Sequence, residues 1–152
     1  MSYRDQLKDD LIFDEGLKYT PYKDTLGYNT IGVGRCIDTN PLPAYAKAEL
    51  EANGKLSLTT ILELLEKDID KAEQNARKLF ESFNDFTDNR KGALVNLLFN
   101  LGITTFSKFI TCIAAIRNGQ WGAAGAALKN SKWYRQVQKT RSERIIRQII
   151  EG

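Results

Sequence analysis

Apolar side chains at helical spacing begin the chain. They predict a helix over residues 3–15, preceded by the capping sequence Ser2-x-x-Asp5 and ended by Gly16. From residue 17 to residue 34 the pattern changes to short runs of Tyr, Thr, Ile and Val that Pro and Gly interrupt, which is typical of strands and tight turns. We therefore expect a small antiparallel hairpin sheet directly after the first helix.

A loop at residues 40–43 and a short helix over 44–52 lead to the longest helical pattern. This pattern begins at Thr60-x-x-Glu63 and extends to about Phe80, so the predicted helix of about 21 residues is about 32 Å long. Such a helix is longer than one small lobe needs and suits a connection between two lobes. Helical spacing continues beyond it, and we expect helices over 88–101, 105–118, 121–130 and 139–150, with a short piece at Trp133-Tyr134.

Composition narrows the chemistry that the chain can perform. Its 152 residues are typical of one soluble globular domain, and none of them is histidine. The absence of histidine excludes serine–histidine and cysteine–histidine nucleophile pairs, histidine bases and almost all zinc enzymes. Cys36 and Cys112 match no disulfide framework or metal motif, and two free thiols are favoured over a bridge. We therefore expect no metal and no cofactor, and any catalysis must use carboxylates, hydroxyls or lysines.

Charge is distributed unevenly along the chain, although its formal net value is only +3. The segment from residue 48 to residue 88 is acidic, whereas the segment from 129 to 147 contains a single acid, Glu143. The bases of this second segment are Lys129, Lys132, Arg135, Lys139, Arg141, Arg144 and Arg147. A basic segment favours a polyanionic partner, such as nucleic acid, an anionic envelope polymer or a membrane surface, but a solvated helix face explains it equally well.

Two carboxylates and a hydroxyl stand close together in the first helix and the hairpin. Glu15 ends the helix, Asp24 follows in the hairpin, and Thr30 lies on the returning strand. A carboxylate in the last turn of a helix faces the negative end of the helix dipole, which favours its protonated form. Glycosidases need one protonated carboxyl for the leaving oxygen and one ionised carboxylate to activate water or stabilise positive charge. The trio is thus a candidate catalytic set, although most carboxylates at such positions are simply solvated.

The residue identities around this trio are more specific than its spacing. The segments Asp14-Glu15-Gly16-Leu17, Tyr22-Lys23-Asp24-Thr25 and Thr30-Ile31-Gly32-Val33-Gly34 resemble the N-terminal signature of the phage-type lysozymes, the T-even-like muramidases of glycoside hydrolase family 24. The resemblance covers about residues 5–147. Later landmarks of the family follow in order at residues 93–102, Phe106-x-x-Phe109, Trp121, Ser131-Lys132-Trp133-Tyr134 and Arg141-x-x-Arg144.

This resemblance implies a lysozyme-like fold, α+β but mainly α, in a single domain over residues 1–152. A small N-terminal lobe with a hairpin sheet would cover about 14–59, a connecting helix about 60–80, and a helical C-terminal lobe about 81–152 together with the first helix. The implied substrate is peptidoglycan, cut at the β-1,4 bond between N-acetylmuramic acid and N-acetylglucosamine for bacterial cell lysis. We expect the protein to act as a monomer.

The resemblance also implies roles for single residues. Glu15 matches the family's general acid, Asp24 its second carboxylate, and Thr30 the residue that helps to hold the attacking water. Members of this type invert the anomeric carbon, which requires the two carboxyl groups to lie about 6.5–9.5 Å apart. Arg141 matches an arginine beside the catalytic Glu, whose charge favours the carboxylate form and opposes the effect of the helix dipole.

Substrate-contacting positions of the family fall on Tyr22, Asn100 and Phe109; for the last two, core packing or surface polarity is an equal alternative. The chain departs from its relatives where they have a histidine after Gly-x-Gly, because Arg35 stands there. In those relatives the histidine pairs with an aspartate on the long helix, at the position of Asp68. An Arg35–Asp68 pair would keep a lobe-bridging ion pair and remove its titration near neutral pH, because guanidinium stays charged.

Two other functions compete with a muramidase. A non-cleaving peptidoglycan-binding or scaffold protein on the same fold is disfavoured, because a binder needs neither carboxylate nor the threonine. A nucleic-acid binder is disfavoured because the last helix has a core-facing side made of Ile145, Ile146, Ile149 and Ile150. We expect no nucleic-acid partner and no stable membrane insertion.

The charged start of the chain bears on where the protein acts. Its first ten residues contain three acids and two bases, unlike a signal peptide. We expect the protein to stay in the bacterial cytoplasm until a separate pore releases it to the periplasm and cell wall, as a phage endolysin. A toxin or effector moved by a secretion system is the alternative.

Overall fold

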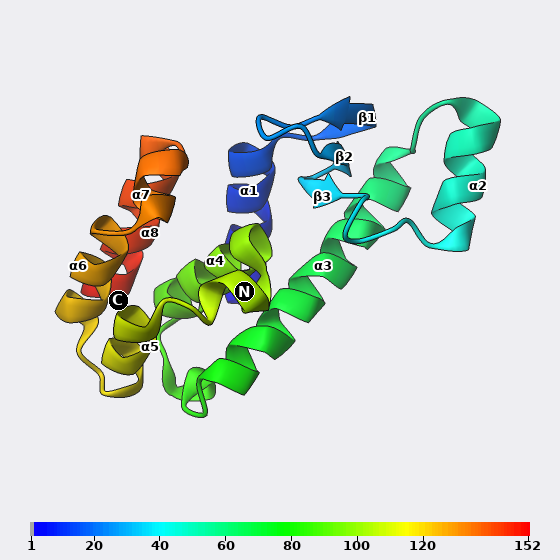
Figure 1. The fold of residues 1–152 in the computed structure, drawn as a ribbon. Coiled ribbons are helices and arrows are strands. Elements are labelled where there is room, and N and C mark those ends of the chain that lie inside the picture. The colour runs from blue at the N-terminus through cyan, green and yellow to red at the C-terminus, as the bar shows by residue number, and fades with distance from the viewer. Residues whose placement is uncertain (1) are drawn as a thin grey trace. The chain divides into compact units, whose positions relative to one another are not determined.

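The computed structural model describes residues 2–152, which form eight helices, three short strands and a 3₁₀ turn (Figure 1). This composition confirms the predicted α+β class with a mainly helical content. In chain order the elements are α1 (Tyr3–Glu15), β1 (Lys18–Lys23), β2 (Asn29–Gly32), β3 (Arg35–Cys36), α2 (Ala44–Asn53), α3 (Leu58–Leu79), the 3₁₀ turn η1 (Phe83–Asp85), α4 (Asp88–Phe106), α5 (Ile110–Arg117), α6 (Trp121–Lys129), α7 (Lys132–Gln136) and α8 (Lys139–Glu151).

The chain divides into two compact units. One unit runs from Lys8 to Ile69, and the other consists of Asp70–Gly152 together with the start of the chain up to Leu7. Helices α1 and α3 each contribute residues to both units. The lobe boundaries expected from the sequence, near residues 59 and 80, remain a prediction.

The unit Lys8–Ile69 contains the sheet. Its strands are antiparallel in the order β1-β2-β3, and Tyr22 pairs with Thr30. The expected hairpin is present, and a third strand extends it because the turn after Gly32 brings Arg35 back beside Ile31. Gly32 and Gly34 both have positive φ, of 67° and 61°, which side chains other than glycine rarely adopt. The Gly-x-Gly sequence therefore makes the tight return from β2 to β3 possible.

The start of α3 differs from the prediction, in which the helical pattern begins at Thr60. The helix begins at Leu58, and Ser57 is the capping residue, because its Oγ accepts a hydrogen bond from the backbone N–H of Thr60 at 3.2 Å. Glu49 of α2 accepts hydrogen bonds from the Ser57 N–H and, at 2.6 Å, from the Thr60 hydroxyl. The Glu49 carboxylate therefore holds the first turn of α3 in place.

Apolar side chains from the sheet, α1, α2 and α3 form the core of this unit. Ile31 of β2 is fully buried, and the side chain of Ile61 lies against Gly32 of the same strand. Leu56 is also buried, and its N–H bonds to the Tyr19 carbonyl of β1, which connects the α2–α3 loop to the sheet. Further buried members are Leu11, Val33, Ala46, Leu64, Leu65 and Ile69.

In the unit Asp70–Gly152, one helix boundary was predicted wrongly. Gly102 has φ 77° and ψ 161° and breaks the helix as expected, but helical structure resumes and α4 ends at Phe106. The next helix, α5, accordingly begins at Ile110 and not near Thr105. The reason is tertiary: Phe106 is fully buried and its ring packs against Phe80, with ring centroids 6.4 Å apart, so the core holds the end of this last helical turn.

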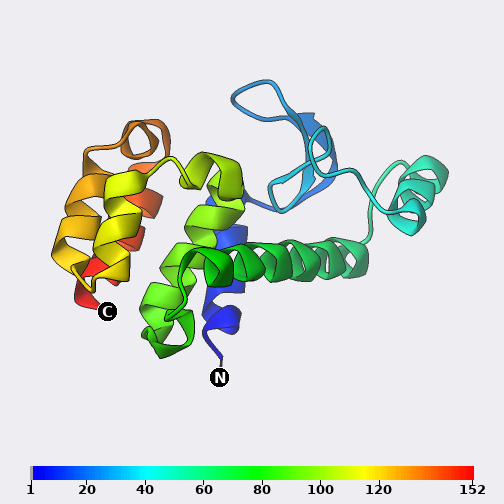
Figure 2. The ribbon, with the colours of Figure 1, turned by 60° about the horizontal axis from the view of Figure 1, so that its bottom comes forward.

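Helix α6 packs against both α5 and α8 (Figure 1 and Figure 2), and α4 also contacts α8. Gly125 permits the close approach of α6 to α8, because a Cβ at this position would lie 2.5 Å from the Ile150 side chain. Arg90 of α4 donates hydrogen bonds to the carbonyls of Ile149 and Ile150 at the end of α8, and its guanidinium stacks on Trp121 at 4.2 Å. Ile145 and Ile149 are fully buried, whereas Ile150 is 43% exposed, so the predicted core face of α8 is shorter than expected.

The structure also bears on the cysteines and on the length and hydropathy of the helices. Cys36 and Cys112 are both free, as the interpretation of two thiols predicted. No single helix within residues 2–152 is both long enough and apolar enough to cross a membrane; α4 and α5 together meet these two criteria but are bent by 118°.

Candidate active site

Glu15 is the last residue of α1, and the turn between β2 and β3 supports its carboxyl group. Gly16 ends the helix with φ 78°, which turns the chain toward β1. A Cβ built on Gly34 would lie 2.7 Å from Cδ of Glu15 and 2.9 Å from its Cγ. The acidic side chain therefore lies directly on the backbone of the Gly-x-Gly turn, in a space that only glycine leaves open.

Asp24 holds the turn between β1 and β2. Its Oδ1 accepts hydrogen bonds from the backbone N–H groups of Leu26 and Tyr28, both at 2.9 Å. Two backbone bonds between Asp24 and residues Gly27 and Tyr28 close the same turn. The other carboxylate oxygen, Oδ2, has no hydrogen-bond partner among residues 2–152, so it is available to a ligand or to water.

Thr30 lies on β2, opposite Tyr22 of β1, and is only 3% exposed. Its hydroxyl donates to the Tyr28 carbonyl at 3.0 Å. A hydroxyl has one proton to donate and two lone pairs to accept with. Because the proton is directed at Tyr28, Thr30 can present its oxygen to a bound molecule only as an acceptor.

The phenol of Tyr22 lies near both carboxylates, Glu15 and Asp24. The pKa of its phenol is raised above the ordinary value, first by burial and then by the negative charges of Glu15 and Asp24. Both charges thus act on the same hydroxyl, which remains a proton donor at neutral pH. Glu15, Asp24, Thr30 and Tyr22, which the sequence predicted as site residues, therefore lie together in the unit Lys8–Ile69.

Arg35 and Asp68 form the predicted ion pair, at 2.9 Å, with side chains only 8% and 14% exposed. Asn40 completes the group: it accepts from the guanidinium through its carbonyl and its side-chain oxygen, and its amide donates to Asp68. A further bond from Arg35 goes to the Pro41 carbonyl. Both charged residues belong to the same unit, so within that unit the pair joins the end of the sheet to α3.

The remaining predicted residues, Asn100, Phe109 and Arg141, belong to the unit Asp70–Gly152. Asn100 accepts a hydrogen bond from the indole N–H of Trp133 at 3.0 Å, so its side-chain oxygen has a structural role. Phe109 is partly exposed and packs against the ring of Phe106 at 5.5 Å.

Arg141 is 5% exposed and is positioned by a residue that the sequence analysis missed. Its Nε and one terminal nitrogen donate to Oδ1 of Asn96, at 3.1 and 2.8 Å. Asn96 is 2% exposed and lies in an otherwise apolar stretch of α4. A polar residue among apolar neighbours on a core helix was the available signal, because a buried amide needs a hydrogen-bond partner.

The chemistry that these groups can support is proton transfer between carboxyl groups, hydroxyls and a polar substrate. Glu15 and Asp24 differ in their surroundings, since one rests on a backbone turn and the other accepts two backbone N–H bonds through a single oxygen. Within residues 2–152 no group of three or more Cys, Asp or Glu side chains is arranged to hold a metal ion.

Comparison with known proteins adds an independent observation. The family model described as phage lysozyme matches residues 13–147. The chain is 37% identical over 155 residues to probable T4-type lysozyme 2 of Dictyostelium discoideum, which covers 92% of this chain and 91% of that protein. Probable T4-type lysozyme 1 of the same organism is 30% identical over 161 residues, covering 96% and 94%. A SAR-endolysin of Escherichia phage Mu is 28% identical over 131 residues, covering 86% and 67%.

Proposed function

The chain belongs to the phage lysozyme family, and from this premise we propose that it is a muramidase that hydrolyses the β-1,4 bond between N-acetylmuramic acid and N-acetylglucosamine in peptidoglycan. The observation that carries the proposal is the close packing of the Glu15 side chain on Gly34, in the same unit as Asp24, Thr30 and Tyr22. Peptidoglycan is the substrate that the family implies. Action at the cell wall after release by a separate pore is part of the same proposal.

In the proposed reaction Glu15 is the general acid. It donates its proton to the glycosidic oxygen as the bond from C1 to that oxygen breaks, so N-acetylglucosamine leaves as a neutral alcohol. A water molecule adds to C1 from the opposite face, and one of its protons passes to Oδ2 of Asp24, the carboxylate oxygen without a hydrogen-bond partner in residues 2–152. Thr30 accepts a hydrogen bond from that water and orients it, because its own proton is directed at the Tyr28 carbonyl.

The stereochemistry follows from the direction of water attack. Attack opposite to the leaving group inverts C1, so the first product carries the α configuration. The anomer can be assigned by proton NMR of the fresh reaction mixture before mutarotation. A β-anomer as the first product would contradict water attack supported by Asp24 and Thr30, and would instead require a covalent intermediate.

Three residues of the other unit complete the proposal. Asn100 uses its oxygen to accept from Trp133, so its amide NH₂ is the group that would donate to an acetamido carbonyl of the substrate. Phe109 offers a partly exposed aromatic side chain to a sugar ring. Arg141 is a supporting residue, whose buried guanidinium Asn96 holds in one orientation.

The decisive experiment compares wild type with Glu15→Gln, a change that keeps the shape of the side chain and removes its proton. Release of reducing ends from purified peptidoglycan is expected to fall by at least about 10²-fold, the contribution of a positioned general acid. Glu51→Gln is the matched control, because Glu51 is exposed on α2 in the same unit. Near-ultraviolet circular dichroism of all three proteins verifies the folded state.

The outcomes separate an enzyme from a binding protein. If wild type sediments with the wall but releases no reducing ends, the chain is a peptidoglycan-binding protein on the family's fold. If Glu15→Gln hydrolyses as fast as wild type, the reaction does not use Glu15 as its acid.

A further inference from the structure

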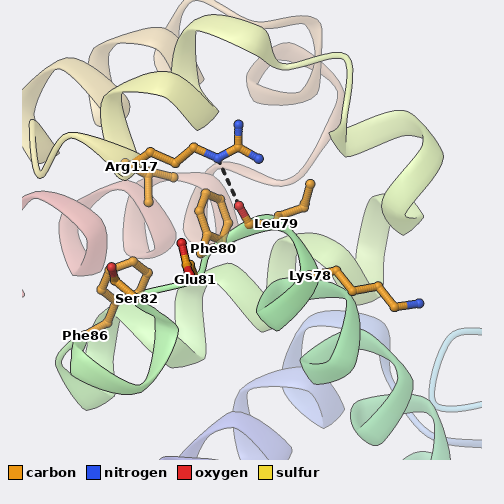
Figure 3. A pocket seen from close by; sticks show the side chains of 8 residues that line it. Lys78, Leu79, Phe80, Glu81, Ser82, Phe86 and Arg117 are labelled. Carbon is orange, nitrogen blue, oxygen red and sulfur yellow. Dashed lines mark hydrogen bonds between the residues drawn. The ribbon is translucent and has the colours of Figure 1, made fainter.

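A pocket of about 350 Å³ lies in the unit Asp70–Gly152, where the end of α3 meets the end of α5 (Figure 3). Phe80 and Ile116, each 1% exposed, belong to the hydrophobic core and form its apolar wall together with the partly exposed Phe86. None of the residues predicted for the hydrolytic site lines it. Its volume is at the lower end of the range for small-ligand sites, about 300–1,000 Å³, which suits one compact ligand.

The rim of the pocket carries polar groups that have no hydrogen-bond partner within residues 2–152. Nε of Arg117 donates to the Leu79 carbonyl at 3.0 Å, the bond drawn in Figure 3, and this fixes the guanidinium. Its two terminal NH₂ groups have no partner in the described part of the chain, and neither do the carboxylate of Glu81 and the hydroxyl of Ser82. A fixed donor, an acceptor and a hydroxyl, which both donates and accepts, are thus available at one rim.

The charges of the pocket decide what kind of ligand fits. An anion would meet the Glu81 carboxylate and the carbonyl end of α3, which is the negative end of the helix dipole. A cation would meet the guanidinium of Arg117. A neutral ligand that donates and accepts hydrogen bonds and also has an apolar face avoids both repulsions. A sugar ring has this chemistry, because its hydroxyl groups point outward around a ring whose C–H face is apolar.

We propose that this pocket is an accessory glycan-binding site that takes one N-acetylated sugar ring. The ring packs its C–H face on Phe86, its hydroxyls donate to Glu81, and Arg117 donates to its acetamido oxygen. The proposal rests on the proposed function for the source of the glycan, which is the peptidoglycan strand. A second point of attachment raises the effective concentration of the wall around the enzyme without any new contact at the hydrolytic site.

The test is a titration of the ¹⁵N-labelled full-length chain with the neutral trimer of N-acetylglucosamine, followed by backbone amide shifts. Saturable shifts are expected at residues 78–82 and 116–117. Glu81→Gln should weaken binding at these amides about two- to tenfold, as expected for one exposed hydrogen bond. Glu151→Gln is the matched control, since it makes the same charge change at an exposed position of the same unit and should leave the affinity unchanged.

Ser82→Ala provides a second variant, because Ser82 is exposed and its loss leaves the core untouched. It should weaken the pocket shifts in the same way. If the pocket amides do not shift in wild type, or if they shift equally in wild type, Glu81→Gln and Ser82→Ala, the pocket is not a glycan site and the proposal is overturned.

The amides of Glu15, Asp24 and Thr30 report on the proposed hydrolytic site in the same spectra. Shifts there without shifts at the pocket overturn the accessory site and leave the proposed function standing. Shifts at the pocket alone, together with no release of reducing ends from peptidoglycan, support the accessory site and count against the hydrolytic function.

Discussion

Replacing Gly34 with alanine tests whether the turn between β2 and β3 positions Glu15 for proton donation. The new Cβ would lie 2.7, 2.9 and 3.0 Å from Cδ, Cγ and Cβ of Glu15, where ordinary contacts begin near 3.4 Å. The turn cannot retreat easily, because Ile31 and Arg35 on either side of it are paired in the sheet and buried. The flexible Glu15 side chain must therefore move, by several tenths of an ångström or into another rotamer.

The size of the effect has two parts. Backbone strain at φ +61° lowers the free energy of unfolding by about 1–2 kcal/mol, the usual penalty for a left-handed residue that has a Cβ. Displacement of the acid lowers the rate of hydrolysis, and a misplacement of about 1 Å can reduce a rate about 10²-fold. We expect Gly34→Ala to lose about 10²-fold in kcat while remaining folded.

Gly54→Ala distinguishes the loss of stability from the loss of rate. Gly54 caps α2 in the same unit with φ +72°, and a Cβ there would meet nothing within 4 Å. It should show the same loss of stability in urea unfolding and no loss in the release of reducing ends. Gly34→Ala with the wild-type rate, or Gly54→Ala with an equal loss of rate, would refute the reasoning.

Three further predictions concern stability and reactivity. Asp68→Asn should lower the free energy of unfolding at pH 7 by about 3 kcal/mol in urea titrations, because it leaves the buried guanidinium of Arg35 without its counter-charge; unchanged stability would mean that the pair contributes nothing. Hydrogen bonds from Thr60 and Ser57 hold the pKa of Glu49 below its ordinary value. The ionised Glu49 carboxylate therefore stabilises the fold fully above about pH 4.5, and this stabilisation is lost as the pH falls through the lowered pKa. Acid unfolding of Glu49→Gln should consequently depend less on pH in that range than acid unfolding of wild type, and identical pH profiles would contradict this. Burial raises the pKa of the Cys112 thiol to about 12, so iodoacetamide at pH 8 should label the partly exposed Cys36 first, as peptide mass spectrometry can show; faster labelling of Cys112 would show that its surroundings open.

Local patterns predicted most of the secondary structure because they act over a few residues. The apolar period and the stop at Gly16 placed α1 at Tyr3–Glu15, and the turn residues between 17 and 34 indicated the hairpin. The same local signals placed Glu15, Asp24 and Thr30 near one another, since a helix end followed by a tight hairpin leaves little freedom for the intervening chain. The family resemblance added their chemical roles, which spacing alone does not specify.

Features that depend on contacts between residues distant in the sequence could not be predicted from local patterns. The pattern predicted that α3 begins at Thr60, but Ser57 is the capping residue, and Glu49, eleven residues before Thr60, accepts hydrogen bonds from the Thr60 hydroxyl and the Ser57 N–H. Phe106 continues α4 beyond Gly102 because its ring is buried against Phe80, which is distant in the sequence.

By itself, then, the sequence determined the approximate positions of the helices, the presence of the hairpin and the order of the candidate catalytic residues, all of which depend on short-range geometry and residue identity. Only the tertiary structure decided that the Glu15 carboxyl lies on Gly34, that Asn96 orients Arg141, and that the ends of α3 and α5 enclose a polar-rimmed pocket. The physical reason is that hydrogen bonds and van der Waals contacts depend on distances of a few ångströms, and folding, not spacing in the chain, sets those distances between remote residues.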